Sequence, residues 1–377
     1  MNKPKKVVFL TGTRADFGKM KPLIDKIENS DLFENYVFVT GMHTLSRYGS
    51  TYREILKNKY KNIFIYLNQT NTTDMDMVLA NTIVGFGNFI KEIKPEMIII
   101  HGDRVESLAG AIVGSLNNIL VCHVEGGEVS GTIDGSIRHS ISKLSHIHFV
   151  SNQEAKNRLA QMGEEPETVF IIGSPDIDVM LSGNLPTLQE AKERYGIDFS
   201  EYGIFIFHPV TTHLDTLETE IRSIVSALIR SGRQYIVVYP NNDHGSNIII
   251  DELRKLEKNN HFRIFPSLRF EHFVVLLKNA SFIIGNSSAG VREAEVFGVP
   301  SINIGNRQNN RTQNVNIINV EARTEEIISS IERVSTMRFS PISNFGNGNS
   351  SELFYKIITE EDVWNIPIQK VFIDNGM

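Results

Sequence analysis

The sequence has little cysteine, no long apolar stretch and no excess of positive charge. Its one cysteine, Cys122, lies in an apolar run, which is typical of a buried structural thiol. A single cysteine cannot form an intramolecular disulfide, and this is consistent with a reducing compartment. No run approaches the roughly 20 apolar residues of a membrane-spanning helix. The apolar run at residues 7–10 is too short for the core of a signal peptide. The net charge of −6 gives no basic surface for nucleic acid. We therefore expect a soluble, cytoplasmic protein that binds neither nucleic acid nor membrane.

The chain is long enough for two hydrophobic cores, because 377 residues exceed what one core usually supports. Short apolar runs alternate with amphipathic stretches in two series. The first series includes residues 97–100, an uninterrupted apolar run typical of a strand buried on both faces of a parallel sheet. The second series begins at residues 203–207. We expect the α/β class, with two Rossmann-like doubly wound domains and a ligand cleft between them.

Residues 173–176, Gly-Ser-Pro-Asp, follow a predicted strand and combine residue types that interrupt regular structure. We interpret them as a hinge between the domains. This interpretation gives an N-terminal domain at residues 1–173 and a C-terminal nucleotide-binding domain at residues 174–360. Residues 361–377 are expected to pack back on the N-terminal domain.

A polar, glycine-rich segment at residues 123–139 separates a predicted strand from a predicted helix. It contains the carboxylates Glu125, Glu128 and Asp134, and Arg138 lies near its end. Parallel α/β folds place chemistry in such segments, at the carboxyl ends of strands. The alternative is a plain surface loop, since glycine and acidic residues are ordinary there. We favour a catalytic segment, in which Glu128 has no assigned role.

Three other predicted strands also end in polar side chains. Asp103 and Arg104 end an apolar run, where an unpaired buried carboxylate would be costly, so the pair needs a ligand or forms a plain ion pair. Arg14 lies in a turn whose glycine spacing excludes a Walker A motif but leaves a phosphate or sugar site open. His43 is either a site residue or a loop histidine with satisfied hydrogen bonds.

The best candidate for a phosphate site is residues 285–290, Gly-Asn-Ser-Ser-Ala-Gly, a turn of small residues between a strand and a helix. The hydroxyls of Ser287 and Ser288 and the backbone amides can hold diphosphate oxygens, although a simple serine N-cap is the alternative. Glu293 could accept hydrogen bonds from ribose hydroxyls or complement the helix dipole. Candidate partners for phosphate charge are Arg14, Arg104 and Arg307.

The sequence does not indicate a metal site or a serine hydrolase. Histidines 139, 146 and 148 lack the helical spacing of metal ligands, and the chain has no Gly-x-Ser-x-Gly motif. The parts suit a nucleotide-sugar enzyme, in which the diphosphate is the leaving group and serines and arginines stabilise its charge. Carboxylates at positions 103, 125 and 134 would stabilise the cationic sugar and move protons.

These motifs resemble those of the hydrolysing UDP-N-acetylglucosamine 2-epimerases, sialic-acid pathway enzymes that yield N-acetylmannosamine. The resemblance covers nearly the whole chain and is carried by residues 14–19, 101–104, 123–134, 136–139, 208–212 and 285–293. The run Glu-Val-Ser-Gly-Thr-Ile-Asp at residues 128–134 is the most diagnostic. The resemblance implies a glycosyltransferase-B arrangement, UDP-N-acetylglucosamine as substrate, no cofactor or metal, a homodimer or homotetramer, and a place in sialic acid, capsule or surface-glycan synthesis.

The resemblance also implies a two-step reaction. Anti elimination of UDP gives 2-acetamidoglucal, and syn addition of water then gives N-acetylmannosamine. Inversion at C2 requires acid/base groups on both sides of the sugar. From the family motif, Asp103 is the base in elimination, Asp134 and Glu125 act in hydration, and His208 contacts the diphosphate or assists its departure. The family's nucleotide contacts map to Arg14, Asn241, Ser287, Ser288, Glu293 and Arg307. Its contacts near the sugar map to Lys19, His43 and Arg138.

Three competing interpretations remain. The first is a hydrolysing 2-epimerase for another nucleotide sugar, such as GDP-N-acetylglucosamine or a UDP-diacetamido-trideoxy sugar. The second is a glycosyltransferase of the same fold, which should carry a basic or apolar acceptor surface that the sequence does not show. The third is a binding module without catalysis, against which the surplus of carboxylates at strand ends argues.

Overall fold

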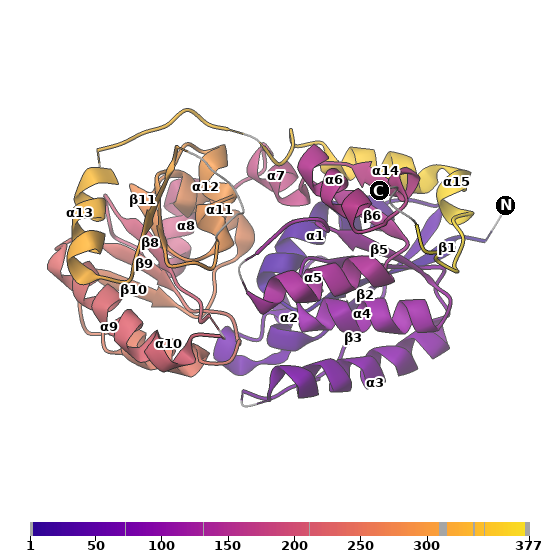
Figure 1. Cartoon of the computed structure of the whole chain (residues 1–377), viewed down its shortest axis with the longest axis horizontal. Coiled ribbons are helices and arrows are strands. Elements are labelled where there is room, and N and C mark those ends of the chain that lie inside the picture. The colour runs from indigo at the N-terminus through magenta and orange to yellow at the C-terminus, as the bar shows by residue number, and fades with distance from the viewer. Residues whose placement is uncertain are drawn as a thin grey trace. The chain divides into compact units, whose positions relative to one another are not determined.

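The protein forms two compact units in a computed structural model, each built around its own parallel sheet (Figure 1). The structure describes residues 3–71, 73–130, 132–210, 212–308, 315–334, 336–342 and 344–373. The first unit comprises residues 1–128, 134–182 and 344–377, and the second comprises residues 129–133 and 183–343. The predicted α/β class with two doubly wound sheets is confirmed.

The sheet of the first unit has seven parallel strands in the order β3-β2-β1-β4-β5-β6-β7. They are β1 (Lys5–Thr11), β2 (Phe33–Val39), β3 (Ile63–Ile65), β4 (Met97–His101), β5 (Leu120–Val124), β6 (Ile147–Val150) and β7 (Val169–Ile171). The strand order reverses between β1 and β4. The loops that follow those two strands therefore flank the switch point, where folds of this type bind ligands.

Helices cover both faces of this sheet. They are α1 (Arg14–Glu28), α2 (Tyr52–Leu56), α3 (Met75–Ile93), α4 (Val105–Leu116), α5 (Ile133–Leu144), α6 (Gln153–Gln161), α7 (Pro175–Met180), α14 (Ser350–Thr359) and α15 (Glu361–Trp364). Helix α1 begins directly after β1 because Thr13 and Asp16 form a capping box.

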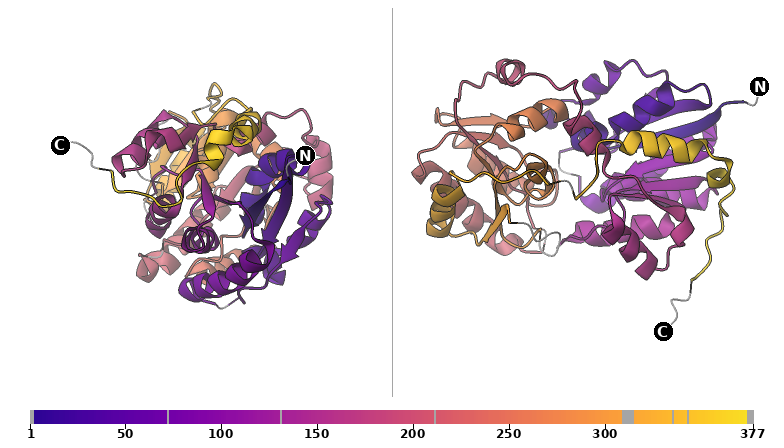
Figure 2. Two further views of the ribbon diagram at one scale, coloured as in Figure 1. Left: turned by 90° about the vertical axis from the view of Figure 1, so that its right-hand side faces the viewer. Right: turned by 90° about the horizontal axis from the view of Figure 1, so that it is seen from above.

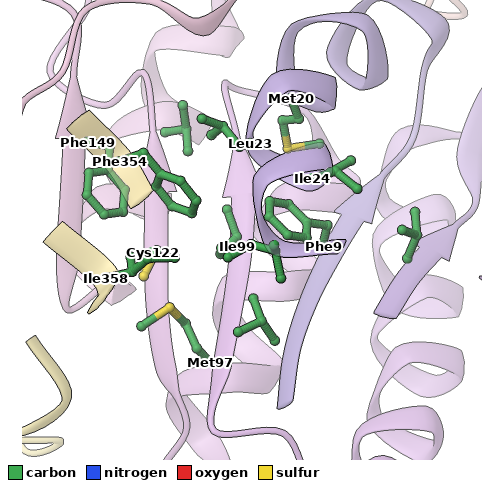
Figure 3. Close-up of a cluster of buried hydrophobic side chains, with 14 of the residues drawn as sticks. Phe9, Met20, Leu23, Ile24, Met97, Ile99, Cys122, Phe149, Phe354 and Ile358 are labelled. Carbon is green, nitrogen blue, oxygen red and sulfur yellow. The ribbon is translucent and has the colours of Figure 1, made fainter. Parts of the chain in front are cut away.

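The C-terminal part of the chain completes the core of the first unit (Figures 2 and 3). Phe354 and Ile358 of α14 are fully buried in the cluster that includes Phe9, Met20 and Cys122. The ring of Phe354 lies 5.1 Å from that of Phe149, centroid to centroid. Burial raises the pKa of the Cys122 thiol, which keeps it protonated as a packing group. The return to the first unit thus begins at residue 344 and not at residue 361, because α14 presents its apolar face to this sheet.

The predicted hinge at residues 173–176 lies inside the first unit, which continues to Ser182. Pro175 occupies the first position of α7, where its missing N–H costs nothing, so the residues that suggested a linker start a helix instead. The backbone N–H of Ser174 donates to the carbonyl of Phe345 over 2.6 Å, which ties this segment to the returning chain.

The sheet of the second unit has six parallel strands in the order β10-β9-β8-β11-β12-β13. They are β8 (Gly203–Ile206), β9 (Tyr235–Val238), β10 (Phe262–Phe265), β11 (Phe282–Gly285), β12 (Ser301–Ile304) and β13 (Ile317–Val320). The helices are α8 (Leu188–Tyr195), α9 (Leu214–Arg230), α10 (Ser246–Arg254), α11 (Phe270–Lys278), α12 (Glu293–Val296) and α13 (Thr324–Val334). Apolar clusters cover both sheet faces, and the switch point lies between β8 and β11. In the described part of the chain, every helix is too short or too polar to cross a bilayer.

Candidate active site

Asp103 lies just past β4, at the switch point of the first unit. Arg138 of α5 donates from Nη2 to its carboxylate. The arginine side chain is only 3% exposed and the aspartate side chain 26%, so a buried cation holds a carboxylate that solvent or a ligand can reach. The neighbouring Arg104 points elsewhere, with its Nε 3.5 Å from Oε2 of the buried Glu106. Asp103 and Arg104 are adjacent in the sequence, but the structure gives each a different partner.

Glu125 follows β5, the neighbour of β4, and is nearly fully buried. Its backbone φ of +64° lies in the left-handed region, which residues other than glycine seldom adopt and which often marks functional sites. Ser174 donates its hydroxyl hydrogen to Oε1, and Nε2 of His101 lies 3.2 Å from Oε2. Ser174 therefore holds one carboxylate oxygen through a hydrogen bond, and His101 lies beside the other.

Asp134 and Arg138 both lie on α5, four residues apart, and so share one face of the helix. Asp134 therefore lies on the same face of α5 as Arg138, the residue that donates to Asp103. Ser142, in the last turn of α5, bonds through its hydroxyl to Nδ1 of His123 over 3.0 Å. Nε2 of the same ring donates to the carbonyl of Gly102 over 2.8 Å. Burial lowers the pKa of His123 to about 3, so a neutral ring links α5 to the loop that carries Asp103.

Lys19 of α1 forms a buried ion pair with Asp176 of α7, with 3.0 Å between Nζ and Oδ2. Their side chains are 11% and 1% exposed. Lys19 was predicted to lie near the sugar. Asp176 was predicted only as part of the hinge.

Two predicted ligand contacts of the first unit have partners within the fold. His43 is buried, with Nε2 3.0 Å from the hydroxyl of Thr11 and Nδ1 2.6 Å from that of Thr51. Burial lowers its pKa to about 4, although the carboxylate of Asp16 opposes this shift. Arg14 pairs with Glu54 of α2 over 3.0 Å. A role for His43 and Arg14 in ligand binding stays a prediction.

Glu128, which had no assigned role, is also buried. Its Oε1 accepts a hydrogen bond from the hydroxyl of Ser151 over 3.1 Å. This contact joins the loop after β5 to the loop after β6.

In the second unit, the predicted phosphate turn lies at the switch point. Gly285 has a φ of +132°, and a Cβ atom there would lie 1.9 Å from the carbonyl oxygen of Ile206, so only glycine fits. The side chain of Asn286 accepts from the backbone N–H of His208 over 2.6 Å and donates to its carbonyl over 2.8 Å. These bonds join the loops after β8 and β11. Ser287 caps the short turn that follows, because its hydroxyl accepts from the N–H of Ala289 over 3.3 Å.

His208 presents a defined tautomer. Its Nδ1 accepts a hydrogen bond from the backbone N–H of Asn241 over 3.1 Å, so the proton of the neutral ring lies on Nε2. Arg307 donates to the carbonyl of Asn286 over 3.3 Å, and the buried Glu293 begins α12. The fold therefore brings the predicted nucleotide contacts of this unit to one edge of its sheet, with Asn286 at their centre.

Among the described residues, no group of three histidine, cysteine or acidic side chains is arranged to hold a metal ion. The candidate site residues are charged side chains after β4 and β5 in the first unit, and His208 after β8 with the turn after β11 in the second.

Comparisons with known proteins agree with this description. The sequence pattern of the UDP-N-acetylglucosamine 2-epimerase family matches residues 25–359. The UDP-N-acetylglucosamine 2-epimerase of Neisseria meningitidis serogroup B is 48% identical over 374 residues, which are 98% of this chain and 99% of that protein. The UDP-N,N'-diacetylbacillosamine 2-epimerase (hydrolyzing) of Legionella pneumophila is 33% identical, over 94% of this chain and 95% of the relative.

A solved structure shares the fold. The UDP-GlcNAc 2-epimerase of Methanocaldococcus jannaschii, in complex with UDP-GlcNAc and UDP, superposes with a TM-score of 0.80 and 23% identity, covering 94% of this chain and 99% of that one. The family pattern and the Neisseria relative both indicate the family that the sequence motifs resemble. The chain belongs to the UDP-N-acetylglucosamine 2-epimerase family.

Proposed function

We propose that the protein is a hydrolysing 2-epimerase that converts UDP-N-acetylglucosamine and water to N-acetylmannosamine and UDP. The observation that carries the proposal is the cluster of acidic groups at the switch point of the first unit. Asp103 and Glu125 follow adjacent strands, and Arg138 connects Asp103 to the helix that begins near Asp134. The sequence motifs and the 48% identity to the Neisseria enzyme favour this substrate over others.

In the first step, Asp103 takes the proton from C2 while the anomeric C–O bond breaks and its electron pair leaves with UDP. The remaining electrons form the C1–C2 double bond of 2-acetamidoglucal. Because the C2 proton is weakly acidic, C–O cleavage runs ahead of proton removal. The buried guanidinium of Arg138 stabilises the charged form of Asp103 and fixes its direction.

In the second step, water adds to C1 and a proton adds to C2 from the face opposite to the first. Asp134 and Glu125 serve this step, one by accepting the proton of water and the other by delivering a proton to C2. Ser174 orients Glu125 through a hydrogen bond to Oε1, and Nε2 of His101 lies 3.2 Å from Oε2.

The second unit stabilises the departing diphosphate. Nε2–H of His208, the hydroxyls of Ser287 and Ser288, and the guanidinium of Arg307 supply donors for phosphate oxygens. Glu293 and Asn241 contact the nucleoside part. Donors that are already oriented lower the barrier for C–O cleavage because little reorganisation is needed as charge develops.

The decisive experiment is NMR of the purified protein with UDP-N-acetylglucosamine in deuterated water. We expect free UDP and N-acetylmannosamine that carries deuterium at C2. Formation of intact UDP-N-acetylmannosamine would contradict the hydrolysing mechanism, because the sugar would then return to the nucleotide. Turnover without deuterium at C2 would contradict proton exchange at that carbon.

A second candidate substrate is a UDP-diacetamido-trideoxy sugar. The specific observation in its favour is the 33% identity to the Legionella enzyme, which is named for UDP-N,N'-diacetylbacillosamine. Parallel assays with both UDP sugars and with GDP-N-acetylglucosamine distinguish these substrates by their kcat/KM values.

We also propose a homodimer or homotetramer in the cytoplasm. Several large apolar side chains of the first unit are exposed on β3, the loop after it and α3, namely Phe64, Ile65, Leu67, Met77 and Val84. Such a concentration is typical of a subunit interface. Light scattering of the purified protein measures the mass, and charged substitutions in this set are expected to give monomers.

A further inference from the structure

The first turn of α7 touches the candidate active site at two points. Ser174, immediately before α7, donates to Oε1 of Glu125, and Asp176, in the first turn, pairs with Lys19. Both are completely buried. The short segment of residues 174–176 therefore contacts one proposed acid/base residue and one proposed sugar-binding residue.

The Asp176 carboxylate is difficult to explain by stability alone. Burying a charge costs free energy, and a buried ion pair rarely repays that cost better than apolar side chains would. In the described structure neither carboxylate oxygen of Asp176 has a hydrogen-bond partner, and the ammonium of Lys19 lies 3.0 Å from Oδ2. A buried carboxylate that costs folding free energy and pairs with one cation is expected where that cation must be held in one place.

The segment is itself held firmly. The N–H of Ser174 donates to the carbonyl of Phe345. Gly173 has a φ of +79°, and a Cβ atom there would approach the Cα of Gly346 to 3.0 Å. The chain that returns to the first unit thus braces the segment from behind, so that it can hold other groups in turn.

We propose that Ser174 and Asp176 are positioning residues of the active site, which orient Glu125 and Lys19 respectively. Asp176 sets the place of the ammonium that contacts the sugar, and Ser174 stabilises the charged form of Glu125. This proposal rests on the proposed function, since it takes Glu125 and Lys19 as parts of the reaction.

The first test is a double-mutant cycle on kcat with Asp176→Asn and Lys19→Met. If Asp176 acts through Lys19, Asp176→Asn lowers kcat at least tenfold in the native protein but leaves it unchanged in the Lys19→Met background. Multiplicative losses in the double variant would show a merely structural role and overturn the proposal. Asp176→Glu, which keeps the charge, is expected to recover part of the lost kcat and serves if the Asn variant does not fold.

Asp178→Asn is the matched control on the same helix. The carboxylate of Asp178 accepts from the N–H groups of Ser350 and Ser351, over 2.8 and 2.7 Å, at the start of α14. We expect a lower melting temperature with unchanged kcat. A loss of kcat as large as that of Asp176→Asn would mean that any damage to α7 inactivates the enzyme, which would contradict a specific role for Asp176.

The second test is the pH profile of kcat for Ser174→Ala. Removing a hydrogen bond from a carboxylate raises its pKa, so the limb set by Glu125 should move up by about 1 pH unit. Ser151→Ala removes an equivalent serine from the buried Glu128 and should leave the profile unchanged. An unshifted profile for Ser174→Ala would refute its role.

Failure of the proposed function is separable from failure of this proposal. If the native protein does not release UDP from UDP-N-acetylglucosamine, the proposed function is contradicted. If it does, and the variants at positions 174 and 176 match the native kcat and pH profile, only the positioning role is overturned.

Discussion

The two units share a parallel, doubly wound sheet topology, but different contacts surround their switch points. In the first unit, charged side chains pair with one another near the carboxyl ends of the strands: Asp103 after β4 pairs with Arg138 of α5, and Lys19 of α1 pairs with Asp176 of α7. In the second unit, the side chain of Asn286 after β11 bonds to the backbone of His208 after β8, and Arg307 donates to the backbone carbonyl of Asn286. Under the proposed function, the first edge moves protons and the second holds the diphosphate.

Under the proposed function, the two tasks make different demands on the same fold. Proton transfer needs carboxylates whose direction and charge are set by neighbours, which requires several long-range pairs. Anion binding needs N–H and O–H donors at a strand-to-helix turn, which a short local sequence with glycine can supply. The first edge should therefore be sensitive to changes in charge, and the second to changes in backbone shape.

The largest expected effect comes from Asp103→Asn. Loss of the base should slow elimination by about 10³-fold, within the range for removal of a general base. The assay is release of UDP from UDP-N-acetylglucosamine. Glu128→Gln, another carboxylate of the first unit, is the control and should change the rate less than a few fold. Undiminished elimination in the Asp103 variant would remove it from the role of base.

The corresponding change in the second unit is Gly285→Ala. A Cβ atom at this φ would strike the carbonyl of Ile206, so we expect a loss of about 3 kcal/mol in unfolding free energy together with weaker UDP binding. Gly87→Ala is the control, because a Cβ atom there meets nothing within 4 Å and alanine favours helices. Chemical denaturation measures both. Equal stability of the two variants would contradict the steric argument.

A smaller effect concerns acid stability of the first unit. The folded state holds the pKa of His43 at about 4, whereas the unfolded chain takes up the proton near pH 6.5. The unfolded state therefore binds more protons below pH 6.5, and the native protein loses stability as the pH falls from 6.5 towards 4. Between pH 7.5 and 5, the native protein should lose about 2 kcal/mol more than His43→Asn. Parallel slopes for the two proteins would disprove this.

The smallest effect separates the two ring nitrogens of His208. His208→Asn can still accept from the N–H of Asn241 but lacks the donor at the Nε2 position, so Kd for UDP should rise about tenfold. His208→Gln keeps a donor near Nε2 and should bind UDP more tightly than the Asn variant. Calorimetry with UDP measures both. The reverse order would mean that the hydrogen bond to Asn241 matters more than a contact to phosphate.

Sequence patterns predicted the parts of the molecule whose signals are local. Apolar runs followed by polar residues located the strand ends, and with them Asp103, Glu125 and the turn at residues 285–290. Family motifs added His208 and Arg138, whose roles no local pattern indicates.

The partners of these residues could not be predicted in the same way. Ser174 and Glu125 are 49 residues apart, and nothing near either one specifies the other. The same holds for Asp176 with Lys19, since a buried carboxylate and a surface carboxylate look identical in a sequence. The amphipathic pattern of α14 shows that one face is buried but not against which sheet.

The return of α14 and α15 to the first unit has a consequence for how the protein is made. Phe354, Ile358 and Val363 belong to the core of the first unit, yet they are translated after the entire second unit. On the ribosome, the first sheet must wait with part of its apolar face uncovered while the second unit emerges and can already fold. The order of synthesis is therefore not the order of completion. During that interval the nascent chain exposes the apolar surface that α14 later covers.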